Sequence, residues 1–246
     1  MYRFPSLLLA ATLLYGLCMA PAIATASSEE QELKELVDRS KTTLDNFMTD
    51  SNMEWLREHF HEASGVFIVP RMWKGGFILA GEGGRGILFS KDAKTGRWHG
   101  PAFYSIGTAS GGLQAGLQVS EIVLLAMSQR GVDSLLSSTV KLGAGVSIAV
   151  GPVGVGVEGG TAVLSADLLT FVRAKGLFGG VSLDAAIIDT WDGANRTYYG
   201  KEVRPSDILM KHTVSNPQSA GLKEALARAA KGEAPSAEKS APRSKP

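Results

Sequence analysis

Cysteine is nearly absent from the sequence, because Cys18 is the only one in 246 residues. A lipid-modified cysteine normally follows a small residue and has leucine three places upstream, where this sequence has Leu17 and Tyr15. Lipoprotein anchoring at Cys18 is therefore the poorer reading. If a leader is cleaved after Ala24 or Ala26, the mature chain has no cysteine, which excludes disulfides, a disulfide-linked partner and a thiol nucleophile.

A strong net charge is also lacking, since 25 Lys and Arg stand against 24 Asp and Glu, giving +1. The charges are nevertheless unevenly placed. Residues 27–62 hold ten acidic and four basic side chains, so the remainder of the chain is mildly basic. We expect no nucleic-acid partner.

Long apolar runs are confined to the N-terminus. Arg3 precedes an apolar run over residues 7–14, and two A-x-A sites follow within residues 22–26. This order is typical of a secretory signal peptide. We therefore predict a signal peptide over residues 1–26 and an exported protein that is periplasmic, extracellular or membrane-associated.

Glycine is abundant, with 29 residues that fall between apolar residues and show no collagen period. In KLGAGVSIAVGPVGVGVEGG (141–160), branched residues alternate with small ones. We interpret this stretch as a hairpin that turns near Gly151 and Pro152, with its bare face leaving room for another element. An outer-membrane barrel also has alternating strands, but the aromatic residues do not recur at the strand ends, so a soluble curved sheet is favoured.

Periodicity predicts helices before the sheet and after it. Apolar residues at helical spacing predict an amphipathic helix from Ser27 to Met48. A second helix is expected over residues 53–63, and short helices over 132–136, 206–210 and 222–231. The expected apolar face of the first helix comprises Leu33, Leu36, Val37, Leu44, Phe47 and Met48.

A period of two from Gly65 onward predicts short strands. They are expected at residues 66–69, 77–80, 86–90, 102–106, 113–119 and 122–127, and residues 167–174 and 177–190 are expected to form a further hairpin. We predict an α+β fold, in which N-terminal and C-terminal α-helices cover a curved, antiparallel, Gly-rich, barrel-like β-sheet. Residues 27–231 form the domain, and 232–246 form a disordered tail.

Motifs that would indicate catalysis or a cofactor are missing. GEGGRG (81–86) resembles a phosphate-binding loop, but strand-like sequence follows it, so we interpret it as a tight hairpin. His59 and His61 would point apart on a helix, and His99 and His212 are isolated in the sequence, so no metal site is expected. We predict neither a cofactor nor an enzyme. Residues 195–197 form a formal glycosylation sequon, which we interpret as a turn.

One cluster suggests a binding site. VPRMWKGGF (69–77) places Arg71 and Lys74 on either side of Trp73, with Phe77 close behind. Tryptophan is favoured at membrane interfaces, and neighbouring cations attract anionic headgroups. The alternative is an ordinary strand connection whose tryptophan covers the edge of the core. We name Arg71, Trp73, Lys74 and Phe77 as candidate lipid-binding residues.

Several long runs resemble the SYLF domain family. The resemblance covers about residues 30–211 and is carried by AVGPVG (149–154), GLFGGVSL (176–183) and ANRTYYG (194–200). It implies non-catalytic lipid binding, with phosphoinositides as the ligands of eukaryotic relatives. It also implies membrane contact through a basic, amphipathic N-terminal region, whereas residues 27–62 are acidic here.

The signal peptide and the single compact unit look like the secreted bacterial branch of that family. The expected function is binding of anionic membrane phospholipids at the periplasmic or extracellular side. The alternative is a periplasmic structural or assembly module that binds a protein partner.

Overall fold

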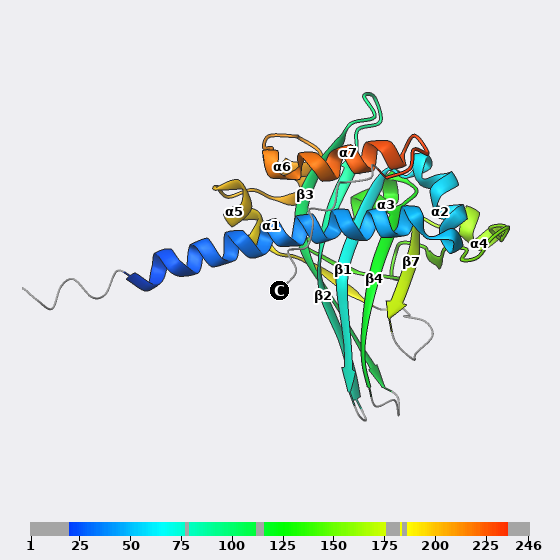
Figure 1. The fold of residues 1–246 in the computed structure, drawn as a ribbon, viewed down its shortest axis with the longest axis horizontal. Helices are drawn as coiled ribbons and strands as arrows, with labels where there is room; N and C mark the ends of the chain where they lie inside the picture. The colour runs from blue at the N-terminus through cyan, green and yellow to red at the C-terminus, as the bar shows by residue number, and fades with distance from the viewer. Residues whose placement is uncertain (1–19, 77–78, 112–115, 176–182, 184–185, 236–246) are drawn as a thin grey trace, which may run out of the picture.

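The structure is a computed structural model that describes residues 20–76, 79–111, 116–175, 183 and 186–235. Within them the chain has the predicted α+β fold, in which helices pack on a strongly curved sheet (Figure 1). Cys18, Phe77, most of GLFGGVSL and the end of the predicted tail lie outside the described residues. None of the described helices is long and apolar enough to cross a membrane.

In the described part of the chain, eight strands form one sheet in the order β5-β8-β3-β2-β1-β4-β7-β6. All neighbours pair antiparallel except β6 and β7, which are parallel, so the sheet is mixed rather than purely antiparallel. The strands are β1 (Gly65–Gly76), β2 (Leu79–Lys91), β3 (Trp98–Gly111), β4 (Gly116–Ala126), β5 (Thr139–Lys141), β6 (Ile148–Val150), β7 (Leu168–Lys175) and β8 (Ile187–Thr190).

Helices from both ends of the chain lie side by side across one face of this sheet (Figure 1). The α-helices are α1 (Ala20–Thr49), α2 (Glu54–His59), α3 (Gln129–Leu135), α4 (Thr161–Leu164), α5 (Asp192–Tyr199), α6 (Pro205–Leu209) and α7 (Ala220–Ala229), and the short 3-10 helices are Ser51–Met53, Phe60–Glu62 and Pro217–Ser219. All six predicted apolar residues of the first helix are buried. The first turns of α1 extend beyond the body of the molecule.

Alternating side chains divide the core between the two faces of the sheet. The face that packs against α1, α2, α5 and α7, here called the α1 face, carries Val66, Ile68, Ile87, Phe89, Phe103, Val123, Leu125, Leu169 and Phe171. The opposite face carries Phe67, Val69, Leu88, Tyr104, Ile106, Ile122, Leu124, Leu168 and Ile188. Branched and aromatic residues on both faces favour long central strands, because each strand is covered on both sides.

A bulge interrupts β1 in its middle. Its register with β2 shifts between Ile68 and Arg71, and its register with β4 shifts between Val69 and Met72. An extra residue at this point changes which side chains face each way. Pro70 lies within the bulge, where its missing N–H breaks no ladder bond.

The structure corrects three predicted turns. Residues 141–160 do not form a hairpin, because β5 pairs with β8 while β6 pairs with β7 at the other edge of the sheet. Residues 167–190 form no hairpin either, since β7 and β8 lie on opposite sides of the central strands. GEGGRG lies within β2 rather than in a tight turn. Local alternation predicted strands over residues 141–160, but only Lys141 and residues 148–150 of this stretch are in strands, and alternation did not indicate their pairing partners.

Candidate functional site

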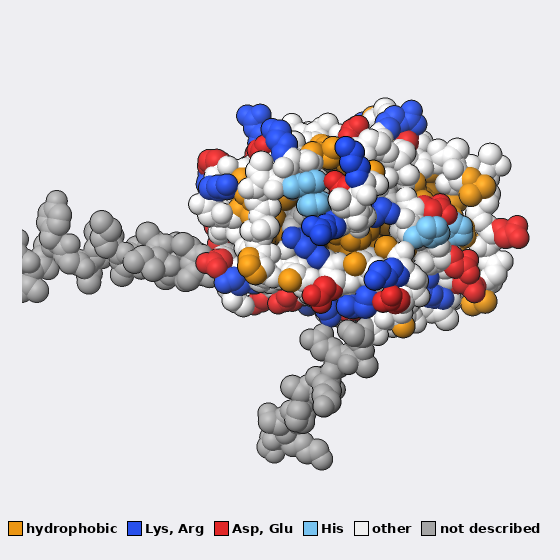
Figure 2. Space-filling view, turned by 90° about the horizontal axis from the view of Figure 1, so that it is seen from above, with side chains coloured by type: hydrophobic (Ala, Val, Ile, Leu, Met, Phe, Trp, Pro, Cys, Tyr) orange, Lys and Arg blue, Asp and Glu red, His pale blue; other side chains and the backbone are white. Residues whose placement is uncertain are grey.

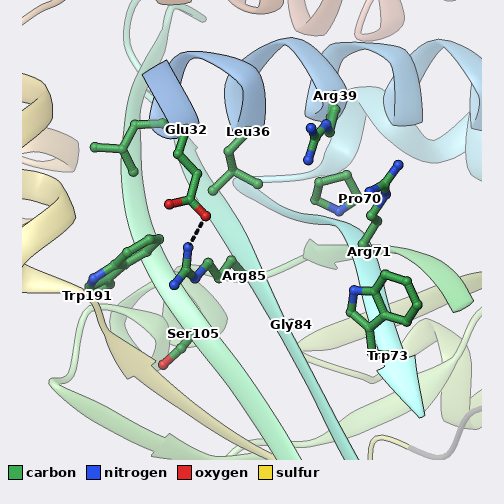
Figure 3. Close-up of a pocket in the computed structure, with 11 residues that line it drawn as sticks. Glu32, Leu36, Arg39, Pro70, Arg71, Trp73, Gly84, Arg85, Ser105 and Trp191 are labelled. Carbon is green, nitrogen blue, oxygen red and sulfur yellow. Dashed lines mark hydrogen bonds and ion pairs between the residues drawn. The ribbon is translucent and has the colours of Figure 1, made fainter. Parts of the chain in front are cut away.

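A groove runs between α1 and the sheet on the α1 face. It consists of two cavities of about 480 and 450 Å³ that share Arg39, Pro70, Arg71 and Trp73. Figure 3 shows the first cavity, with Arg39 from α1 above Arg71 and Trp73 from β1. We call the two cavities together the α1–β1 groove.

The bulge in β1 places Arg71 and Trp73 on the groove side. Met72, between them, is buried in the opposite core. The bulge also requires a small residue on the neighbouring strand, since a Cβ on Gly84 would lie 2.6 Å from the Arg71 carbonyl oxygen. One glycine of GEGGRG, predicted to lie in a tight hairpin, thus instead permits the close approach of two strands.

The arginines around the groove differ in whether they already have a partner. Arg39 is paired with Glu35 at 2.6 Å on α1. Arg85 bonds the Glu32 carboxylate and stacks its guanidinium 4.1 Å from the Trp191 ring. Within the described part of the chain, Arg71 has no ion pair and no side-chain hydrogen bond. Its guanidinium is therefore available to an incoming anion.

The far wall of the groove holds a separate charge network. Arg173 bonds Asp50 at 2.9 Å and Glu121 at 2.8 Å. Thr43 and Asn46 from α1 also donate hydrogen bonds to Glu121. Because this carboxylate accepts three donors, it is largely satisfied and competes weakly for Arg71.

Apolar side chains give the groove an amphipathic character. Trp73 is 52% exposed although it projects from a strand. Pro70, Leu36 and Trp191 line the same cavity. The groove can accept an anionic group at Arg71 while an apolar part rests against Trp73.

The structure does not bring all four predicted site residues together. Arg71 and Trp73 lie together in the groove. Lys74 instead projects to the opposite face, where its Nζ lies 2.6 Å from Glu82 Oε1, so it does not share a surface with Trp73. Phe77 lies outside the described residues.

No sequence pattern had singled out Arg39 of α1, Arg85 of β2 or Trp191, which lies between β8 and α5. Arg85 could have been predicted, because it lies two positions before Ile87 on the same strand and therefore faces α1 as Ile87 does. No local pattern indicates that Arg39 or Trp191 meets β1. Their positions depend on how α1 crosses the sheet and on where β8 pairs.

The structure also corrects the expectation that His99 and His212 are isolated. Their rings stack with 3.3 Å between centroids at an angle of 14°. The two residues are 113 positions apart in the chain, and α6 and the segment after it bring them together on β3.

Comparisons with known proteins agree on one family. The family model described as Ysc84, Las17-binding protein actin regulator, matches residues 107–229, which is half of the chain. Arg71, Trp73 and Arg85 precede that matched stretch.

Individual proteins align with the chain over more residues than the family model does. SH3 domain-containing YSC84-like protein 1 from Homo sapiens is 33% identical over 167 residues, which cover 67% of this chain and 48% of that protein. LAS seventeen-binding protein 3 from Saccharomyces cerevisiae is 30% identical over 151 residues, covering 60% of this chain and 32% of that protein. The chain spans about half the length, or less, of the curated relatives it matches. The family match, these relatives and the motifs at residues 149–154 and 194–200 lead to one conclusion: the chain belongs to the Ysc84 family of SYLF domains.

Proposed function

We propose that this chain binds anionic phospholipid headgroups in the α1–β1 groove without catalysing a reaction. One observation carries the proposal: Arg71, which has no carboxylate partner among the described residues, lies beside the half-exposed Trp73. Guanidinium groups bind phosphates with paired N–H donors. Tryptophan places its ring at the boundary between headgroups and acyl chains.

The magnitudes fit reversible surface binding. A cation near an anionic membrane contributes about 1 kcal/mol, and a buried tryptophan ring adds a contribution of similar or larger size. One arginine and one tryptophan therefore give weak attachment, which a second contact strengthens. Arg39 and Arg85 supply that contact if a phosphate displaces their glutamate partners. The acidic face of α1 opposes binding, so the attraction of the arginines must exceed this repulsion, and salt weakens that attraction by screening it.

A binding role is supported by the comparisons, because the names of the family and of its relatives describe binding proteins. The groove lining, as far as the structure describes it, also contains no histidine or cysteine. The location that we propose is the periplasmic or extracellular side of a membrane, on the basis of the signal-peptide pattern at residues 1–26 and of the resemblance to the secreted bacterial branch.

Vesicle co-sedimentation tests this function. Untagged protein is mixed with vesicles of phosphatidylcholine alone or with added phosphatidylglycerol, at low and high salt. We expect binding only to the anionic vesicles, weakened by salt, and a loss of about fivefold in Arg71→Glu. Arg97→Glu, exposed in the β2–β3 turn, is the matched charge control and should lose less. Equal losses in the two variants would show that general charge, and not the groove, attracts the membrane.

A second candidate function is binding of a protein partner. Large apolar residues are exposed from the end of β6 to the end of α4, comprising Val150, Val153, Val155, Val157 and Leu164. The segment is held in place, because Gly154 N donates to Asn52 O and Gly156 N donates to Glu54 Oε2. An ordered apolar ridge of this kind suits a protein interface. Failure to bind either vesicle, together with a pull-down partner lost on Val155→Asp, would favour this function.

A further inference from the structure

A second cluster of chemically active side chains lies at the β2–β3 turn, separate from the α1–β1 groove. Asp92, His99 and His212 each place one potential ligand atom so that all three atoms lie within 4.8 Å of one another. Figure 2 shows histidine side chains exposed on the face seen there, with Lys and Arg side chains around them. All three residues are partly exposed, so an ion can reach them from solvent.

His212 is held by its backbone and by a hydrogen bond. It is the only described non-glycine residue with positive φ, at 55°. One of its ring nitrogens, Nε2, lies 3.1 Å from the Leu209 carbonyl oxygen and donates to it. That carbonyl is itself fixed by the Ser90 hydroxyl at 2.6 Å. An imidazole that donates at Nε2 has its lone pair on Nδ1, and a backbone acceptor on the second nitrogen is the usual way in which proteins orient a metal-binding histidine.

Asp92 is held by the turn that contains it. Its Oδ1 accepts hydrogen bonds from Lys94 N at 2.9 Å, Thr95 N at 2.7 Å and Thr95 Oγ1 at 3.0 Å. No described group donates to Oδ2, which leaves one carboxylate oxygen for an ion. The carboxylate therefore keeps its position whether or not an ion is bound.

From this arrangement we propose that Asp92, His99 and His212 form a binding site for a divalent transition metal ion of the Zn²⁺ class. Two imidazoles and one carboxylate are a ligand set that Zn²⁺, Co²⁺ and Ni²⁺ prefer, whereas Mg²⁺ and Ca²⁺ prefer oxygen ligands alone. Three protein ligands leave a fourth position for water or an external ligand.

Nearby cations limit the affinity of the site. Arg97 and Lys223 lie close enough to act electrostatically on His99. They also repel a dication, so we expect moderate affinity.

Binding requires one local rearrangement. The two rings are nearly parallel, so their lone pairs lie in two nearly parallel planes. A tetrahedral ion needs these lone pairs to converge, and rotation of the partly exposed His99 ring about its χ2 bond opens the stack while His212 keeps its hydrogen bond to Leu209. The bound ion would tie the β2–β3 turn to the segment that follows α6, two parts of the molecule far apart in sequence.

Titration of untagged protein with Zn²⁺ by calorimetry, and with Co²⁺ by visible absorption, tests the site. We expect about one equivalent of either ion, tetrahedral Co²⁺ bands, and a higher Tm in the presence of Zn²⁺. His212→Asn removes the imidazole while tolerating positive φ, and His99→Gln and Asp92→Asn keep similar shapes. Each should weaken binding at least tenfold.

The control is His61→Gln, since His61 is an exposed histidine with its own carboxylate neighbour, Glu62 Oε1, at 3.9 Å. This variant should bind as the wild type does. Melting curves without metal show whether each variant is folded. The proposal is overturned if folded wild-type protein binds no Zn²⁺, or if folded His99→Gln and His212→Asn bind as tightly as wild type.

Discussion

Lys74 and Glu82 form an ion pair across β1 and β2, with 2.6 Å between Nζ and Oε1 and only 2% of the Glu82 side chain exposed. Removing the lysine leaves a buried carboxylate unpaired. We expect Lys74→Met to lower the free energy of unfolding by on the order of 3 kcal/mol, while Lys74→Met with Glu82→Leu recovers most of the loss. Urea unfolding measures both. Because Lys74 lies away from the groove, the folded single variant should still sediment with anionic vesicles.

Trp73 gives the sharpest test of the groove. Its side chain is half exposed, so Trp73→Ala should change the free energy of unfolding by less than about 1 kcal/mol. Binding to anionic vesicles should nevertheless fall roughly tenfold, because the ring would no longer enter the interface. Trp98→Phe, at a buried position on β3, is the control for losing a tryptophan. Unchanged sedimentation of Trp73→Ala would exclude the groove as the membrane-binding site.

Asn195 connects α5 to the central strand β3. This fully buried side chain accepts from Phe103 N at 2.9 Å and donates to the carbonyl oxygens of Phe103 and Trp191, both at 3.2 Å. Asn195→Ala leaves the Phe103 groups unpaired and should cost about 2–4 kcal/mol by chemical unfolding. Thr197→Ala, also in α5, should cost far less. The same contacts explain why residues 195–197 are neither a turn nor a surface acceptor for glycan.

Gly151 marks the closest approach of the Gly-rich segment to the core. A Cβ at this position would lie 2.1 Å from Phe171 Cζ, a side chain that is fully buried. We expect Gly151→Ala to lower the free energy of unfolding by roughly 1–3 kcal/mol through overpacking. In the same segment, a Cβ at Gly160 meets nothing within 4 Å, so Gly160→Ala should leave the free energy of unfolding nearly unchanged. Thermal denaturation of both variants and the wild type measures the difference. Similar losses at both glycines would contradict this explanation.

Asp167 makes the structure sensitive to acid. The Arg130 guanidinium, and then the Ser128 hydroxyl, hold the pKa of this buried carboxyl well below 3.8, its ordinary value. Since the pKa is depressed on folding, the stabilisation is fully present above about pH 4 and is lost as the pH falls below that value.

Asp167→Asn tests this dependence. The variant should be less stable than wild type by on the order of 2–4 kcal/mol at pH 7. The difference should shrink when urea unfolding is repeated toward pH 3. A difference that does not change with pH would indicate that packing around Asp167, and not its charge, is the cause.

The sequence predicted the types of element well and their partners poorly. Leu33, Leu44 and Phe47 fall on one helical stripe, which is a local signal, and all three are buried on the sheet. Val153 and Val155 carry an equally clear strand pattern, yet both are exposed in an irregular segment. Alternation shows which residues can share a face, but strand pairing depends on contacts that are distant in sequence.

The candidate site shows the same limit. Arg71 and Trp73 are two positions apart on one strand, which puts both side chains on one face. Lys74 is the next residue after Trp73, so the same alternation places it on the other face. Arg85 and Trp191 come from other strands or their ends, and His99 meets His212 only when the C-terminal segment folds back. Contacts between residues so far apart in the chain cannot be predicted from the local spacing of residue types.

The bulge around Pro70 limits how this strand can change during evolution. Substitutions at Arg71 or Trp73 can alter the groove one side chain at a time. Insertion or deletion of a single residue between Val69 and Arg71 would instead rotate the remainder of β1, turning Trp73 toward the interior and Lys74 toward α1. We therefore expect natural relatives to vary the chemistry of this groove by residue exchange while keeping the length of β1 constant.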